Sequence, residues 1–176
     1  MNMKQPNCHE NYPFWIVLIS NLLSIAICAI GAYLISRLGA IWLVLYLLFI
    51  LVQEIKLLKG HCVSCYYYGK YCAFGKGKLS SLLFKKADPK KFARMQLTWK
   101  DLLPDFMVSL IPIIVGVVLL IRAFSWLVLA LILILLLLTF IGNGAVRSSL
   151  ACKYCKQRKL GCPAEKLFDK TKKPGK

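Results

Sequence analysis

Residues 14–35 read FWIVLISNLLSIAICAIGAYLI, a run without a single charged side chain. A helix needs about 20 apolar residues to cross the hydrocarbon core of a bilayer. Lipid offers no partners to backbone N–H and C=O groups, so an isolated stretch of this kind must be a helix. The stretch therefore predicts a membrane-spanning helix. Its length and the lack of a clear small-residue cleavage site disfavour a cleaved signal peptide.

Three further apolar segments follow the first. They cover about residues 38–52, with an extension to 58 if charged side chains reach the interface, then 106–121 and 123–141. Gly142-Asn-Gly144 is expected to end the last of them. The whole chain is 59% hydrophobic with a net charge of +17, which is unlike an ordinary soluble domain. We predict an all-α membrane protein whose four transmembrane helices form two tandem hairpins, each followed by a cytoplasmic cysteine module.

The distribution of Lys and Arg predicts the orientation of these helices. The two short links carry only Arg37 and Arg122, whereas the other 22 of the 24 basic residues lie in the N-terminus, the middle segment and the tail. Cytoplasmic segments of membrane proteins are enriched in Lys and Arg. We therefore expect an integral membrane protein with both termini and both cysteine modules in the cytoplasm.

Six of the eight cysteines form two copies of one motif, C-x2-C-x6-C, and the second copy follows the first by 90 residues. Each copy comes after one pair of predicted membrane helices, which indicates an internal duplication. Parallel repeats of this kind can be related by a pseudo-twofold axis along the membrane normal. Such symmetry would bring the two motifs together. Their cysteines are Cys62, Cys65 and Cys72 in the first copy, and Cys152, Cys155 and Cys162 in the second.

The repeat divides the chain into six segments. Two membrane hairpins are expected, and the first cysteine module is expected to include an amphipathic helix over about 89–103 on the membrane surface. The N-terminus carries Cys8 and His9, which could donate a ligand to a metal, but we expect it to be loose, as chain ends usually are. The segments are 1–13 (N-terminus), 14–58 (hairpin 1), 59–103 (cysteine module 1), 104–141 (hairpin 2), 142–168 (cysteine module 2) and 169–176 (disordered basic tail).

Metal binding is the favoured use of the six cysteines. A C-x2-C pair places two thiolates on one turn, and tetrahedral zinc sites are commonly built in this way. Each motif supplies only three sulfurs. His61 would complete the first set, but Ala151 occupies the matching position before the second. Six pooled thiolates could instead hold about two zinc ions if two of the sulfurs bridge them.

The second motif, Cys152-Lys-Tyr-Cys155-Lys-Gln-Arg-Lys-Leu-Gly-Cys162-Pro, resembles half of the binuclear zinc cluster of fungal transcription factors. That family also pairs two C-x2-C-x6-C motifs about a pseudo-twofold axis. The resemblance is limited to the motifs, because here 79 residues separate Cys72 from Cys152. It implies the cluster chemistry, and DNA recognition is not carried over.

Two other uses of the cysteines stay open. An iron–sulfur cluster bound by four of the six would indicate membrane electron transfer, and spacing alone does not separate iron from zinc. Disulfides are the third alternative, disfavoured by the predicted cytoplasmic location because cytosolic thiols are normally kept reduced.

No catalytic constellation is visible among the seven acidic residues and two histidines, so an enzyme is disfavoured. We expect a structural, regulatory or partner-binding membrane module, with an iron–sulfur or thiol redox protein as the alternative. Its basic segments would face anionic lipid headgroups or an acidic protein partner. A membrane-tethered nucleic-acid binder ranks last, because membrane topology already explains the basic residues. A homo-oligomer is left open.

Overall fold

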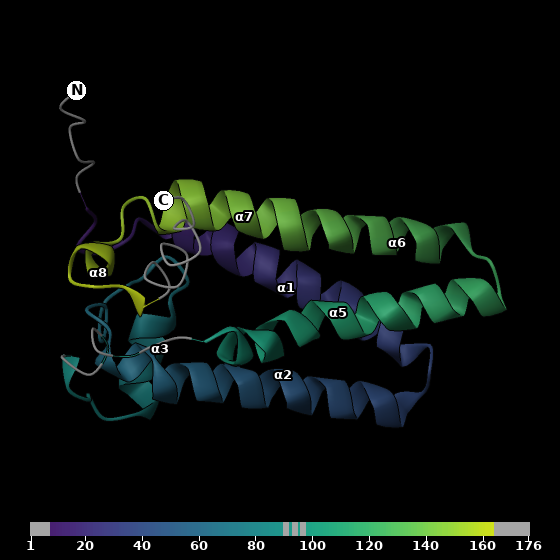
Figure 1. The fold of residues 1–176 in the computed structure, drawn as a ribbon, viewed down its shortest axis with the longest axis horizontal. Helices are drawn as coiled ribbons and strands as arrows, with labels where there is room; N and C mark the ends of the chain where they lie inside the picture. Colours follow the sequence, from purple (N-terminus) through teal and green to yellow (C-terminus); the bar gives the residue numbers. More distant parts are fainter. Residues whose placement is uncertain (1–7, 90–91, 93–94, 96–97, 164–176) are drawn as a thin grey trace, which may run out of the picture. The chain divides into compact units, whose positions relative to one another are not determined.

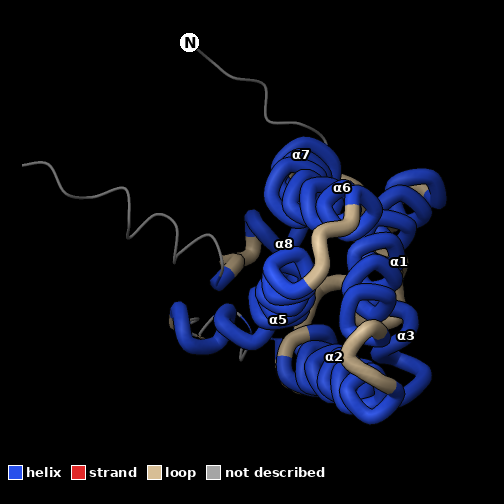
Figure 2. The backbone as a smooth tube through the Cα atoms, turned by 90° about the vertical axis from the view of Figure 1, so that its right-hand side faces the viewer, coloured by secondary structure: helices blue, strands red, loops and turns tan. Residues whose placement is uncertain are grey.

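The computed structural model describes residues 8–89, 92, 95 and 98–163, without the side chains of residues 99–102. Within these residues the chain consists of helices and loops, and an isolated bridge between His9 and Cys155 is its only β-type pairing (Figure 1, Figure 2). The chain divides into two compact units, which we call the cysteine unit and the helical unit. The cysteine unit comprises Met1–Ser20, Lys56–Trp99 and Val146–Lys176, and the helical unit comprises Asn21–Ile55 and Lys100–Ala145.

Four helical segments are long and apolar enough to cross a membrane, as the sequence predicts. Their large apolar side chains are widely exposed, for example Ile41, Ile121 and Trp126, each more than three-quarters exposed. A water-soluble protein rarely presents so much apolar surface, so these faces fit a lipid environment. The segments are Phe14–Ser36, Ala40–Ser64, Leu103–Arg122 and Trp126–Ala151. They contain α1 (Phe14–Ser36), α2 (Ala40–Gly60), most of α5 (Trp99–Arg122) and α6 (Trp126–Leu136).

The fourth segment does not end at Gly142–Gly144, so that prediction is wrong. After α6 the chain continues through η2 (Leu137–Gly142) and α7 (Asn143–Ala145) to η3 (Val146–Ala151), with η2 and η3 in π-helical geometry. A glycine inside a helix costs only about 1 kcal/mol relative to alanine. At Gly142 the missing side chain leaves room for Leu23, because a Cβ there would lie 3.0 Å from Leu23 Cδ1. The helical segment therefore runs directly up to Cys152.

The third helix begins at Trp99, earlier than the apolar run alone indicates. It continues through two prolines, Pro104 and Pro112. Of the amphipathic helix expected over 89–103, six positions (90, 91, 93, 94, 96 and 97) lie outside the described residues. Among the others, Met95 and Thr98 are not helical, and residues 99–103 already belong to α5. The described part is therefore not one continuous helix over 89–103.

The helical unit packs through small residues and one interhelical hydrogen bond. Gly31 lets α1 approach α5 closely, since a Cβ there would lie 2.9 Å from Cγ of the buried Pro112. Small residues serve the same purpose at many helix contacts in membranes. Tyr46 on α2 donates its hydroxyl hydrogen to the carbonyl of Val108 on α5 at 2.8 Å. The buried apolar centre of the unit is formed by Ile27, Leu34, Val128, Ile132 and Leu135.

The cysteine unit is built from short helices joined by tight turns. The 3₁₀ helix η1 (Cys62–Ser64) follows α2, then α3 (Lys76–Leu83) follows the first motif, and α8 (Lys156–Lys159) lies inside the second. α3 starts after Gly75, whose φ of +68° is one that glycine adopts readily. The apolar centre of this unit is separate from that of the helical unit. It contains Tyr12, Ile16, Tyr67, Ala73 and Ala151.

Candidate functional site

The two cysteine motifs share three backbone hydrogen bonds, although the first contains η1 and the second contains α8. In both, the amide of the second cysteine donates to the carbonyl of the first at 3.3 Å, which closes the C-x2-C turn. Two further hydrogen bonds recur at the same 90-residue offset. The pairs are Tyr68 N–Cys65 O (3.0 Å) with Arg158 N–Cys155 O (3.3 Å), and Lys70 N–Tyr67 O (2.9 Å) with Leu160 N–Gln157 O (3.2 Å). The duplication in sequence is therefore also a duplication in local structure.

The motifs are joined by two reciprocal hydrogen bonds. The amide of Tyr66, directly after Cys65, donates to Oε1 of Gln157 at 2.7 Å. The amide of Lys156, directly after Cys155, donates to the hydroxyl of Tyr67 at 3.0 Å. Tyr67 and Gln157 occupy equivalent positions, and so do Tyr66 and Lys156. Reciprocal contacts between equivalent positions are the mark of a twofold interface, so the motifs are related locally by a pseudo-twofold axis.

The motifs also share one apolar centre. Tyr67 of the first motif is 2% exposed there, beside Ala151, which immediately precedes the second motif. The cysteines Cys65, Cys72 and Cys155 pack against this cluster. Sulfurs from both motifs are therefore brought into a single compact region, as the repeat predicts.

The N-terminal segment is not a loose end over its described part, residues 8–13, and that expectation is wrong. His9 donates its amide hydrogen to Tyr154 O at 3.0 Å and accepts the Tyr67 hydroxyl hydrogen on its carbonyl at 2.6 Å. Tyr12 is buried, donating its amide hydrogen to Tyr71 O at 2.9 Å and its hydroxyl hydrogen to Ala151 O. The segment therefore contacts both motifs and holds them together.

Two equivalent cysteines, Cys65 and Cys155, have thiols with raised pKa values. Burial raises the pKa of Cys65 to about 11, the amide of Tyr67 opposes this by hydrogen bonding to the sulfur, and the nearby Cys155, Cys72 and Cys162 raise it further. Burial likewise raises the pKa of Cys155, against hydrogen bonds from the amides of Arg158 and Gln157. Each sulfur thus sits in an apolar site with backbone N–H groups directed at it.

Backbone N–H groups of this kind stabilise a thiolate once a cation compensates its charge. Cys72 has one as well, since Gly77 N lies 3.4 Å from its Sγ. The donor set consists of thiols and suits zinc or an iron–sulfur cluster. Among the described residues, however, no three His, Cys, Asp or Glu side chains are arranged to hold one ion. The chemistry of the region fits a thiolate-bound metal, and the coordination polyhedron itself is not formed.

The seven predicted site residues are placed as follows. Cys72, Cys155 and Cys162 all lie near enough to Cys65 to add to the rise in its pKa that burial causes, and Cys62 belongs to η1. Cys152 is exposed at the end of the fourth helical segment. The ring of His61 lies edge-on to Phe92, with 6.4 Å between the ring centroids. The structure therefore gives His61 a packing role beside the motif.

Sequence reasoning missed Tyr67 and Gln157, which connect the motifs. The signal that could have found them was the 90-residue offset, which places both two residues after the second cysteine of their motif. It also missed Tyr12 and Asn11, whose Oδ1 accepts the Tyr71 amide hydrogen at 3.3 Å. No local pattern marks those two residues, because their partners are about 60 or more residues away.

No family model, curated protein or solved structure matches the chain.

Proposed function

We propose that this chain is an integral membrane protein whose two cysteine motifs form a zinc clasp on the cytoplasmic side. The orientation is supported by the concentration of Lys and Arg outside the two short interhelical links. In this proposal the helices form two tandem hairpins, and both chain ends lie in the cytoplasm. The clasp has a structural or regulatory role, and no reaction is assigned to it.

The observation that carries the proposal is the reciprocal pairing of the motifs through Tyr67 and Gln157. It gives the motifs twofold-related conformations and favours a pooled set of six thiolates over one separate ion per motif. Six thiolates can supply about two tetrahedral zinc ions when two sulfurs bridge. The ligands would be Cys62, Cys65, Cys72, Cys152, Cys155 and Cys162.

The position of the motifs explains what a clasp would do. Cys62 comes two residues after the end of α2, and Cys152 comes directly after η3. The start of α1 contributes Ile16 to the apolar centre that the motifs share. Zinc bound by both motifs would therefore tie together the ends of three membrane segments. Because metal-binding energy becomes folding energy in sites that the unfolded chain lacks, loss of zinc would release those ends.

Protonation adds a condition to metal binding. Zinc takes thiolate ligands, so binding releases protons from the cysteines. The raised pKa of Cys65 means that the metal must compete with a proton that is held more firmly than usual. The same raised pKa speaks against a thiol redox role for Cys65, because reactive cysteines have lowered pKa values.

The test is metal analysis of full-length protein purified anaerobically in detergent, with an absorption spectrum of the same sample. We expect about two zinc ions per chain and no visible band. Cys65→Ser and Cys155→Ser should each lower the zinc content, whereas Cys28→Ser, which alters a cysteine of α1 outside the motifs, should leave it unchanged. Iron and sulfide in the sample, together with a visible absorption band, would indicate an iron–sulfur cluster in place of zinc. Metal-free protein whose cysteines resist alkylation until reduced would indicate disulfides.

A further inference from the structure

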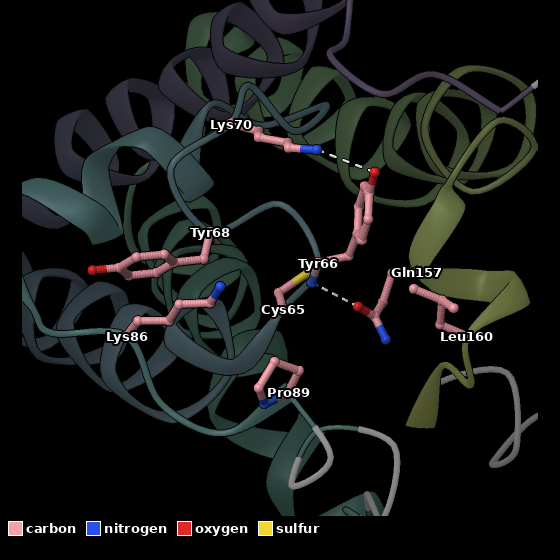
Figure 3. A pocket seen from close by; sticks show the side chains of 8 residues that line it. All are labelled: Cys65, Tyr66, Tyr68, Lys70, Lys86, Pro89, Gln157 and Leu160. Atoms are coloured by element: carbon pink, nitrogen blue, oxygen red, sulfur yellow. Dashed lines mark hydrogen bonds between the residues drawn. The ribbon is translucent and has the colours of Figure 1, made fainter.

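One pocket of about 430 Å³ opens in the cysteine unit, between the two motifs. Cys65, Tyr66 and Tyr68 of the first motif form part of its wall, and Gln157 and Leu160 of the second motif another part (Figure 3). Lys70, Lys86 and Pro89 complete the described lining. The pocket is therefore a product of the pairing of the motifs.

The charged groups of this lining are both cationic. Lys70 is half-buried and Lys86 is exposed, and no aspartate or glutamate belongs to the described wall. Figure 3 shows the two lysine side chains coming from different parts of the chain, with the Lys70 ammonium directed at the Tyr66 hydroxyl. Lys86 makes no hydrogen bond or ion pair with a described residue. The two charged residues of the described wall are therefore both cationic, and the carboxylate of Glu10, which lies near Lys70, is outside that wall.

The neighbouring polar groups are already engaged. Lys156, next to the pocket, is paired with Glu10, with Nζ and Oε1 2.6 Å apart. Lys70 donates one hydrogen to the Tyr66 hydroxyl at 3.1 Å and keeps two, and its ammonium lies 4.4 Å from the centroid of the Tyr66 ring. Gln157 uses its amide oxygen for Tyr66 N and its amide nitrogen for Gly161 O. The side-chain N–H donors of this lining left for a ligand are those of Lys70 and Lys86, together with the second N–H of the Gln157 amide.

We propose that this pocket binds the phosphate monoester headgroup of an anionic lipid, with Lys70 and Lys86 holding the phosphate. The two ammonium charges match the charge of about −1.5 to −2 on a phosphate monoester at neutral pH. Tyr66, Pro89 and Leu160 supply apolar and aromatic surface for the carbon atoms next to the phosphate. The inference rests on the proposed membrane module, which brings lipid to this site.

Chain connectivity supports a lipid as the source of the phosphate. Cys65 lies five residues after Gly60, where α2 ends. Five residues span at most about 18 Å, so the wall of the pocket is confined near the end of a membrane helix. The headgroups of a bilayer lie at the ends of its transmembrane helices.

The experiment measures lipid binding to the full-length protein in detergent by native mass spectrometry. The probes are phosphatidic acid, phosphatidylcholine of the same chain length, and glycerol 3-phosphate. We expect phosphatidic acid to bind more tightly than either of the others. Lys70→Gln and Lys86→Gln should each weaken its binding about tenfold, as expected for the loss of one charge-assisted hydrogen bond. The matched control is Lys85→Gln, which removes the same charge from the exposed neighbour of Lys86 outside the described pocket lining.

Equal weakening by Lys85→Gln and Lys86→Gln would indicate general surface charge and overturn the site. Equal binding of phosphatidylcholine and phosphatidic acid would contradict the recognition of a phosphate monoester. Binding of glycerol 3-phosphate as tight as that of phosphatidic acid would contradict a lipid as the ligand. Zinc content, measured on the same samples, separates the two proposals. Zinc present without selective lipid binding overturns this inference alone, whereas absence of zinc overturns the clasp.

Discussion

Replacing Tyr67 by phenylalanine removes one oxygen atom from the contact between the two cysteine motifs. The ring is 2% exposed, and its hydroxyl both accepts from the Lys156 amide at 3.0 Å and donates to the His9 carbonyl at 2.6 Å. Phenylalanine fills the same apolar volume, so the substitution removes only the contacts of the hydroxyl, which also lies close to the hydroxyl of Tyr12. It leaves one N–H and one C=O without their partner.

The expected magnitude follows from the burial of these groups. A buried polar group left without a partner costs roughly 1–3 kcal/mol. We expect the protection of the Lys156 amide against hydrogen exchange to fall by about 2 kcal/mol, which is about a 30-fold faster exchange. The amide of Tyr66 should keep its protection, because Gln157 still holds it. Gln157→Ala should produce the reverse pattern.

The assay is amide hydrogen exchange by NMR on the full-length protein in detergent micelles. Tyr68→Phe is the matched control, because it removes a hydroxyl that donates only to Phe84 O, at 2.8 Å. It should leave the exchange of Lys156 unchanged. Unchanged exchange of Lys156 in Tyr67→Phe, or equal acceleration in both variants, would refute the assigned contact and with it the reciprocal pairing.

Three further predictions concern Gly77, Cys152 and Cys65. Gly77→Ala places a Cβ against two backbone carbonyls of the motif, one of them 2.7 Å away at Lys70, so we expect about 1–3 kcal/mol of destabilisation by chemical denaturation. The control is Gly60→Ala, whose new Cβ would have no neighbouring atom within 4 Å, so the free energy of unfolding should be unchanged or slightly raised. A destabilisation by Gly60→Ala as large as that by Gly77→Ala would contradict the packing argument. In zinc-free, reduced protein the exposed Cys152 should be alkylated before Cys65, whose rate should keep rising toward pH 11, because burial disfavours its thiolate. The pKa of Cys65 is near 9 in the unfolded chain and near 11 in the folded protein. The contribution of Cys65 to the free energy of unfolding is therefore complete below pH 9 and is lost as the pH rises from 9 to 11. A Cys65→Ser variant with the same alkaline loss of stability would contradict this assignment.

The four membrane segments could be predicted from sequence because the signal is local. An uncharged apolar run of sufficient length leaves the backbone no alternative to a helix in lipid, so the type of element follows from composition alone. The end of the fourth segment could not be predicted in this way. Gly142 and Gly144 are local stop signals, but Gly142 packs against Leu23, more than 100 residues earlier, and the helical segment continues past both glycines.

Part of the candidate site could likewise be predicted from the sequence, and part could not. The 90-residue repeat identified the six cysteines and indicated that the motifs would pair, because ligand types and spacing are written in the chain. The means of pairing was not readable, since the hydroxyl of Tyr67 and the amide of Gln157 can serve many partners. Their use is decided only when the two copies meet.

The sequence by itself determined four membrane-compatible helices, their basic flanks and a duplicated thiol motif, because each depends on residues close together in the chain. Tertiary structure decided which groups connect the copies, that residues 8–12 pack across both motifs, and that two lysines line one pocket between them. These features depend on contacts between segments some 15 to nearly 150 residues apart, as in the pairing of His9 with Tyr154. A side chain's neighbours at that distance are set by the packing of the whole unit, and no local pattern in the chain specifies them.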